Sequence, residues 1–259
     1  MSEKQTFIIA EIMKGQNDMD TLKLDKGSIK MIAHRGLSGI ERENTAAAFV
    51  AAGNRSYFGI ETDVHRTADG KYIIIHDDTT DRVAGEHYPI EQTDFDTLRS
   101  LRLMDMNGEK NRGDLIMPTL EEYLSICKTY EKTAVLELKN NMAEAVILEI
   151  VDIVKGMGYL ENTVFISFSL ENLITLRKTY PTQPAQYLVG EIPDLGEMID
   201  HLKRYHLDID AFFGSITKEV AEELHCNGIK INVWTVDSLE VAEKMAEIGV
   251  DYITTDIIE

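Results

Sequence analysis

The feature that most constrains the fold of this chain is a regular alternation of short apolar runs with longer amphipathic stretches. Apolar runs predict buried strands, and stripes such as Val146, Ile147, Ile150, Val151 and Val154 predict helices. Apart from one returning hairpin strand, eight strand–helix units follow one another, which predicts a parallel sheet closed into an α/β barrel of the (β/α)8 type. The expected strands are 29–33, 57–64, 133–138, 164–166, 185–189, 209–213, 229–234 and 252–253, and the main helices are 46–52, 120 onward, 143–155, 170–178, 195–205, 218–226 and 238–248.

Two segments depart from this rhythm. Residues 1–28 form a polar extension with one short apolar run, Phe7–Ala10, which could add a strand or cover a barrel end. Residues 77–118 are polar and rich in turns, with one short helix near 94–101. They are predicted to be an insertion that follows the hairpin of the second strand. Since 259 residues is an ordinary length for one barrel, a single domain over 1–259 is expected.

Local signals refine these boundaries. Ala68-Asp69-Gly70 is a hairpin turn signal, so the second strand should return over residues 71–75. A hairpin centred between Asp69 and Gly70 would set His76 across from Asp63. Two capping boxes are expected at helix starts, one from Thr119 to Glu122 and one from Asp237 to Glu240.

Composition narrows the classes of partner and location. Lys+Arg total 26 against 45 Asp+Glu, and the net charge of -19 argues against binding nucleic acid or anionic membrane surfaces. The apolar runs are too short for membrane insertion, and the start of the chain lacks the form of a signal peptide. Cys127 and Cys226 give no disulfide framework, which favours a cytoplasmic location. The sequence carries no signal for the oligomeric state.

Two acidic residues interrupt the second apolar run. Glu61 and Asp63 are two residues apart on a predicted strand, so their side chains point to the same face. Two carboxylates that share an inward face repel each other and lose water. A hard divalent cation with oxygen ligands would neutralise them. The alternative is a polar barrel rim where each carboxylate has its own hydrogen-bond partners.

Other strand ends carry polar groups as well, and in a barrel these ends meet at one mouth. Taken singly, the histidines could be satisfied rim residues, Glu137 and Lys139 could form a structural ion pair, and Trp234 could belong to the core. Taken together, the set has the parts for metal-assisted phosphoryl transfer. It contains a cation site (Glu61, Asp63, Glu137), two groups that titrate near neutral pH (His34, His76) and two fixed cations suited to phosphate (Arg35, Lys139).

The same residues lie in motifs that resemble the glycerophosphodiester phosphodiesterase family. The resemblance runs from about residue 30 to the end and implies a TIM barrel with a small insertion after the His-Asp motif. Two positions depart from the family pattern, Arg42 in place of Pro and Tyr252 in place of Gly, which concerns loop shape and substrate preference. The matching motifs are His34-Arg35-Gly36, Ser38-Gly39, Glu43-Asn44-Thr45, Glu61-Thr62-Asp63-Val64, Thr67-x-Asp69-Gly70, His76-Asp77 with Thr79 to Gly85, Pro118-Thr119-Leu120-Glu121-Glu122, Glu137-Leu138-Lys139, Ser167-Phe168, Val233-Trp234-Thr235-Val236, Gly249-Val250-Asp251 and Thr255-Asp256.

The resemblance implies a phosphoric diester hydrolase of lipid and glycerol metabolism that acts on a small soluble phosphodiester. Its products would be an alcohol and sn-glycerol 3-phosphate. One divalent cation, Mg²⁺ or Ca²⁺, would bind Glu61, Asp63 and Glu137, and His34 and His76 would serve as general base and general acid in an order that stays open. The substrate would contact Arg35, Lys139 and Trp234.

Several points stay open at this level. The attacking group is either a glycerol hydroxyl, which would give a cyclic phosphate, or water. Two other functions compete with the leading one: a phospholipase of the C or D type that acts on intact phospholipid, and a non-catalytic barrel that binds phosphate esters.

Overall fold

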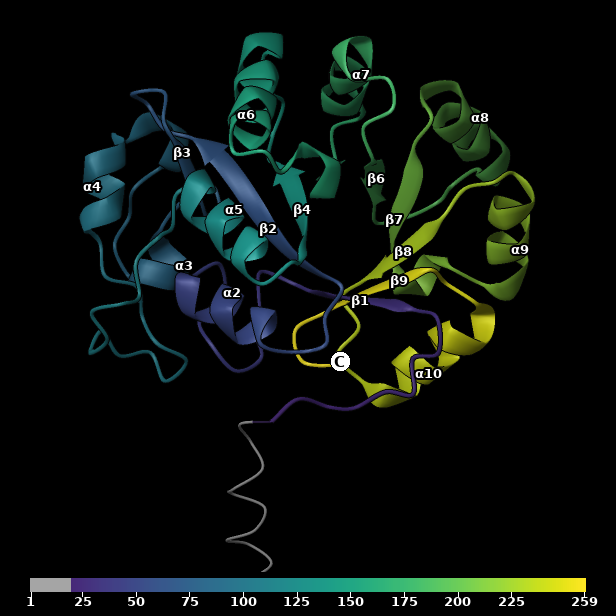
Figure 1. Ribbon diagram of the computed structural model, residues 1–259, viewed down its shortest axis with the longest axis horizontal. Coiled ribbons are helices and arrows are strands. Elements are labelled where there is room, and N and C mark those ends of the chain that lie inside the picture. Colours follow the sequence, from purple (N-terminus) through teal and green to yellow (C-terminus); the bar gives the residue numbers. More distant parts are fainter. Residues whose placement is uncertain (1–19) are drawn as a thin grey trace, which may run out of the picture.

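The centre of the molecule is a closed barrel of eight parallel strands (Figure 1). The computed structural model describes residues 20–259. Pairing between β1 and β2 closes the ring, which confirms the barrel expected from the sequence. The barrel strands are β1 (Lys30–Ala33), β2 (Gly59–Arg66), β4 (Thr133–Leu138), β5 (Thr163–Ser167), β6 (Ala185–Val189), β7 (Asp208–Phe212), β8 (Ile231–Trp234) and β9 (Tyr252–Thr255).

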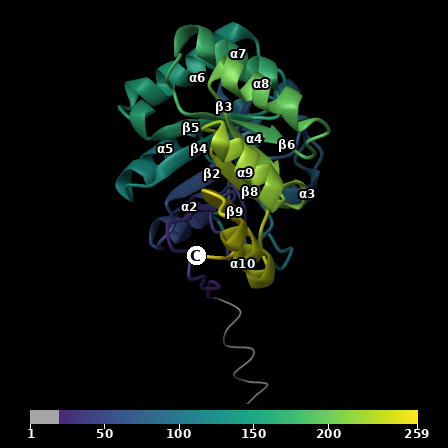
Figure 2. The same cartoon turned by 90° about the vertical axis from the view of Figure 1, so that its right-hand side faces the viewer.

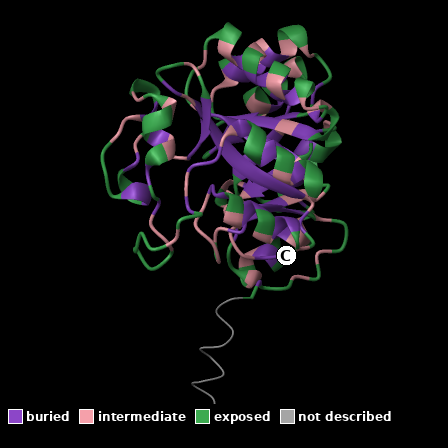
Figure 3. Cartoon of the chain, turned by 60° about the vertical axis from the view of Figure 1, so that its left-hand side comes forward, coloured by how far each residue is buried: buried purple, intermediate pink, exposed green. Residues whose placement is uncertain are grey.

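The strands are buried on both faces, which explains why they are nearly continuous apolar runs in the sequence. One face lines the barrel interior, where Ile32, Val135, Ile166 and Leu188 pack together. The other face packs against the surrounding helices in the largest hydrophobic cluster. Figure 3 shows this layering, with buried strands inside and exposed helix faces outside.

Helices form the outer layer, as Figures 1 and 2 show from two sides. Thr119 and Glu122 form the expected capping box. The one expected from Asp237 to Glu240 is wrong, because Ser238 occupies the N-cap and the Asp237 carboxylate accepts hydrogen bonds from Thr255 and from the Asp256 backbone. The barrel helices are α2 (Ala46–Gly53), α5 (Leu120–Thr129), α6 (Glu144–Gly156), α7 (Leu170–Thr179), α8 (Leu195–Tyr205), α9 (Lys218–Cys226) and α10 (Leu239–Ile248), with short 3₁₀ turns η2 (Leu160–Asn162) and η3 (Phe213–Ser215).

The hairpin after β2 differs by one residue from the expected register. Strand β3 (Tyr72–Ile74) runs antiparallel to β2, and Val64 pairs with Ile74. Ile75, rather than His76, therefore lies across from Asp63, and its N–H donates to the Asp63 carbonyl at 3.1 Å. The turn is centred on Asp69 rather than between Asp69 and Gly70. Each residue of β2 therefore pairs with a residue of the returning strand one position earlier than expected.

Residues 77–118 lie beside the barrel next to β3 and α2 (Figure 1). They contain α4 (Phe95–Ser100), which matches the expected short helix, and also α3 (Asp81–Ala84) and η1 (Ile90–Gln92), which the sequence analysis did not separate. Apolar residues of this segment form a small core of their own with residues of and next to β3. The segment is thus a packed extension of the barrel wall.

The first described residues join the end of the chain. Leu22 forms a parallel bridge with Ile258, and the Glu259 carboxylate accepts hydrogen bonds from the Thr21 hydroxyl and the Ser56 N–H. The apolar run Phe7–Ala10 lies outside the described residues. Among residues 20–259, no helix has the length and apolar character needed to cross a membrane.

Candidate active site

The turn after β1 brings the first polar groups to the mouth of the barrel. Arg35 and Gly36 both adopt positive φ, at 53° and 79°. A Cβ at position 36 would lie 2.7 Å from the backbone carbon of Ala48, so only glycine lets this turn pack against α2. The turn aims the Arg35 N–H at Glu61, whose Oε2 accepts it at 2.8 Å.

Three carboxylates converge below this turn. Glu61 and Asp63 lie on β2 and Glu137 lies on β4, where it pairs in register with Asp63. One oxygen from each residue lies within 4.8 Å of the others, and all three residues are buried. Asn44 donates to Asp63 Oδ2 at 2.7 Å, while the buried Oδ1 accepts no hydrogen bond. Three buried carboxylates this close together supply the oxygen ligands that a hard metal ion prefers, and the Asp63 Oδ1 lacks a hydrogen bond, so this cluster could hold one.

The pKa values of the three carboxylates are shifted in different directions. Burial, and then the neighbouring Asp63, raise the pKa of Glu61 well above its ordinary value. The same two causes raise the pKa of Glu137 to about 8. Burial also opposes ionisation of Asp63, but Arg35, Lys139 and His76 outweigh it and hold that pKa below its usual range. Burial thus disfavours the charged form of all three carboxylates, and the neighbouring cations favour it most strongly at Asp63.

Lys139 contributes a cation beside this cluster. Its Nζ lies 3.1 Å from Glu137 and 3.4 Å from Asp63. The ion pair considered as an alternative for Glu137 and Lys139 is therefore present. This ion pair does not exclude a metal site, because Lys139 lies near one oxygen of Asp63 and one oxygen of Glu137, and each carboxylate has a second oxygen.

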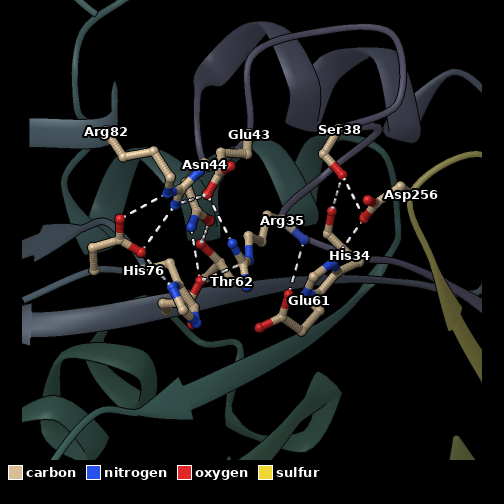
Figure 4. A network of polar contacts seen from close by, with 12 residues as sticks. His34, Arg35, Ser38, Glu43, Asn44, Glu61, Thr62, His76, Arg82 and Asp256 are labelled. Carbon is tan, nitrogen blue, oxygen red and sulfur yellow. Dashed lines mark hydrogen bonds and ion pairs between the residues drawn. The ribbon is translucent and has the colours of Figure 1, made fainter. Parts of the chain in front are cut away.

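Each expected histidine is paired with a carboxylate (Figure 4). His34 Nδ1 lies 2.7 Å from Asp256, which also accepts a hydrogen bond from the Ser38 hydroxyl at 2.8 Å. His76 Nδ1 lies 2.7 Å from Asp77, and burial lowers the pKa of His76. A carboxylate on Nδ1 fixes the orientation of the ring and leaves Nε2 available to the cavity that both rings line.

A chain of ion pairs joins the turn after β1 to the segment after β3, and it is visible in Figure 4. Glu43 accepts hydrogen bonds from Arg35 at 2.9 Å and from Arg82 at 2.8 Å. Arg82 in turn donates to Asp77 at 2.7 Å. The insertion that carries Arg82 thereby helps to position Asp77, which holds His76.

These side chains surround one cavity of about 290 Å³. Trp234 stands on the opposite wall, where its Nε1 donates to the Asp210 carbonyl at 3.2 Å and its ring also packs against the barrel interior. Asp63 and Lys139 do not line this cavity but contact residues that do: Asp63 lies 3.7 Å from Arg35, and Lys139 lies 3.1 Å from Glu137. Of the residues expected at the site, those that line the cavity are His34, Arg35, Glu61, His76, Glu137 and Trp234.

Sequence reasoning did not single out Arg82 or Asp210 as site residues. Arg82 lies within the matching motif Thr79 to Gly85, but that motif gave it no role and no sequence pattern indicated its contacts. Asp210 did carry a signal. It is a lone acid in the apolar strand from Ile209 to Phe213, the same kind of interruption that marked Glu61 and Asp63.

Comparisons with known proteins agree with this geometry. The family model described as the glycerophosphoryl diester phosphodiesterase family matches residues 34–259. A glycerophosphodiester phosphodiesterase of Caldanaerobacter subterraneus subsp. tengcongensis is 32% identical, and the match covers 87% of this chain and 93% of that protein.

Solved structures show the same barrel. An Oleispira antarctica phosphodiesterase in complex with the product sn-glycerol-3-phosphate superposes with a TM-score of 0.81 at 25% identity, over 88% of this chain and 92% of that one. A glycerophosphodiester phosphodiesterase of Parabacteroides distasonis gives 0.74 at 30% identity, over 89% and 94%. With the fold, the mouth and these matches in agreement, the chain belongs to the glycerophosphoryl diester phosphodiesterase family of phosphoric diester hydrolases.

Proposed function

We propose that this protein hydrolyses glycerophosphodiesters to an alcohol and sn-glycerol 3-phosphate, with a divalent ion on the three carboxylates and with proton transfer by His34 and His76. The observation that carries the proposal is the convergence of a buried carboxylate triad and two carboxylate-paired imidazoles on one cavity. The names of the relatives, and the product bound by the Oleispira antarctica protein, support the substrate class.

Glu61, Asp63 and Glu137 would hold the ion, Mg²⁺ or Ca²⁺. When bound, such an ion supplies positive charge and polarises a phosphoryl oxygen. The chain adds fixed cations of its own. Arg35 lines the cavity, and Lys139 lies beside the triad. Both can hold the charge of a phosphodiester in a protein whose net charge is -19.

The two imidazoles divide the proton transfers. One accepts the proton of the attacking hydroxyl at Nε2 as the new P–O bond forms. The other donates a proton from Nε2 to the oxygen of the departing alcohol as the old P–O bond breaks. Asp256 and Asp77 stabilise the protonated rings from the opposite nitrogen. The same arrangement serves attack by water or by a neighbouring glycerol hydroxyl.

The test is release of glycerol 3-phosphate from a panel of glycerophosphodiesters, measured with and without a chelator. His34→Asn and His76→Asn should each lower kcat by roughly 10²- to 10⁴-fold, the range for lost acid–base groups. His225→Gln is a matched control, since His225 pairs with Asp251 on the outside of the barrel. Full turnover in excess EDTA, or by either Asn variant, would contradict the proposal.

The panel also addresses the competing functions. Activity on phospholipid micelles without activity on soluble diesters would favour a phospholipase. Binding of soluble diesters without any product would favour a non-catalytic barrel. The carboxylate-paired histidines argue against the latter, because binding alone does not require proton transfer.

A further inference from the structure

The two halves of the cavity wall differ sharply in chemistry. Strands β1, β2 and β4 contribute the charged groups described above. Strands β5, β6 and β8 contribute Ile166, Leu188 and Trp234, and Phe168 follows β5 directly. This second half is otherwise apolar and aromatic apart from Thr235 and Thr254, and it carries one carboxyl group, that of Asp210 on β7.

Asp210 is buried in a way that the catalytic proposal does not use. It pairs in register with Leu188 on one side and Asn232 on the other, and only 2% of its surface is exposed. Its Oδ1 is buried and accepts no hydrogen bond, although the residue lines the cavity. Among residues 20–259, no Lys, Arg or His forms an ion pair with it. A buried carboxylate without a cation is costly, so burial favours the neutral acid unless a ligand brings a positive charge.

Two aromatic rings, those of Phe168 and Trp234, line the cavity with Asp210, and Phe212 packs against Trp234. Trp234 packs edge-on with Phe168, with centroids 5.6 Å apart and planes at 84°. Phe212 lies 6.0 Å from Trp234 at 60°. Phe168 and Phe212 are 50% and 39% exposed, unusually open for large apolar side chains. Tilted rings of this kind present π-faces, and such faces attract organic ammonium groups.

We propose that this half of the cavity receives the leaving head-group and selects one that carries an organic ammonium, of the ethanolamine or choline kind, through Asp210 and the rings of Phe168 and Trp234. The inference rests on the proposed function and names the substrate class within it. The phosphate would lie at the charged half, so that the ammonium reaches the opposite wall. An uncharged polyol head-group brings no positive charge that would favour the ionised form of Asp210.

The titration of Asp210 gives the inference a second consequence. Burial raises the pKa of Asp210 to about 8. An ammonium group favours the ionised form, so its binding expels a proton from Asp210. KM for an ammonium diester should therefore fall as the pH rises toward 8, while KM for an uncharged head-group should not follow this trend.

The experiment compares four substrates, with choline, ethanolamine, glycerol or inositol as the head-group of the glycerophosphodiester. Wild-type protein should favour the two ammonium diesters. Asp210→Asn should lower kcat/KM for these two by roughly 10- to 100-fold, as expected for loss of a buried counter-charge, and change the other two by less than about threefold. Asp208→Asn is the control, because Asp208 lies on the same strand at its opposite end.

Two further measurements keep the test decisive. Phe168→Leu alters an exposed ring, so it should fold normally and still weaken the ammonium diesters selectively. Tetramethylammonium should inhibit wild-type protein competitively and Asp210→Asn only weakly.

Each contrary outcome has its own meaning. Equal losses on all four substrates would place Asp210 against the shared glycerol phosphate and overturn the inference, as would equal wild-type activity on all four head-groups. Absence of cleavage of every diester would instead overturn the proposed function itself.

Discussion

At the scale of single residues, Asp210 is an unfavourable choice for a barrel interior, and its cost should depend on pH. Its carboxyl has a pKa of about 8 in the folded protein, above the ordinary value of 3.8. A raised folded pKa contributes stability that is complete below about pH 4 and is lost as the pH rises through about 8. Asparagine stays neutral throughout. Asp210→Asn should therefore become more stable than wild-type protein as the pH rises from about 4 to about 8.

The measurement is urea unfolding of both proteins at several pH values. Each tenfold change in proton affinity corresponds to about 1.4 kcal/mol, so the relative gain should reach a few kcal/mol at pH 8 and then level off. Asp200→Asn, on the exposed face of α8, serves as the control. A stability difference between Asp210→Asn and wild-type protein that stays constant from pH 4 to pH 9 would show that Asp210 is not buried in the form described.

Some residues of the site could be predicted from the sequence, and others could not. Glu61 and Asp63 were predicted because their charges break an apolar strand, and that signal is local. Their partners depend on side chains that meet across the fold. The contacts of Arg82 with Glu43 and Asp77 span segments whose approach no periodicity encodes. Contacts of this kind can be identified only in the three-dimensional structure.

At the scale of elements, the pairing of β2 with β4 sets two acids directly opposite each other. Asp63 and Glu137 are neighbours in register, and Glu61 adds a third carboxylate. Like charges across neighbouring strands destabilise a sheet, and a bound cation would relieve them. Mg²⁺ or Ca²⁺ should therefore raise the Tm of this protein.

The size of this effect follows from binding linkage. At a concentration 100 times its Kd, the ion should add about 2.7 kcal/mol to the free energy of unfolding. Glu137→Gln should abolish most of the rise in Tm, because it removes one ligand and keeps the size of the side chain. Glu144→Gln, on the exposed first turn of α6, should leave the rise unchanged. An ion-independent Tm in wild-type protein would argue against the metal site.

Helices and strands could be predicted where a repeating hydrophobic pattern marks them. A register or a helix cap that depends on a single hydrogen bond could not. All eight barrel strands were expected from apolar runs, because both of their faces are buried. The hairpin register was displaced by one residue, since it depends on how Thr67 and Lys71 close the turn. The cap of α10 was misassigned because Asp237 bonds to the chain after β9, a contact between distant segments.

At the scale of the whole molecule, the net charge of the protein influences which substrates approach the site. Net charge does bear on function, because a field from -19 charges acts on every approaching anion. A diester with a choline head-group has no net charge, whereas one with a glycerol head-group carries one negative charge. The global field therefore opposes the second substrate and is nearly indifferent to the first.

Ionic strength should separate these two cases. Screening lengths shrink from about 30 Å at 0.01 M salt to about 8 Å at 0.15 M. Over this range, with the divalent ion held saturating, kcat/KM for the glycerol diester should rise severalfold, while that for the choline diester should change by less than about twofold. The choline diester is thus the internal control for salt effects on the protein itself. A fall in kcat/KM for the glycerol diester would mean that the cations at the mouth, rather than the acidic surface, govern the approach of substrate. In that case the preference for ammonium head-groups would depend on Asp210 and the aromatic rim alone.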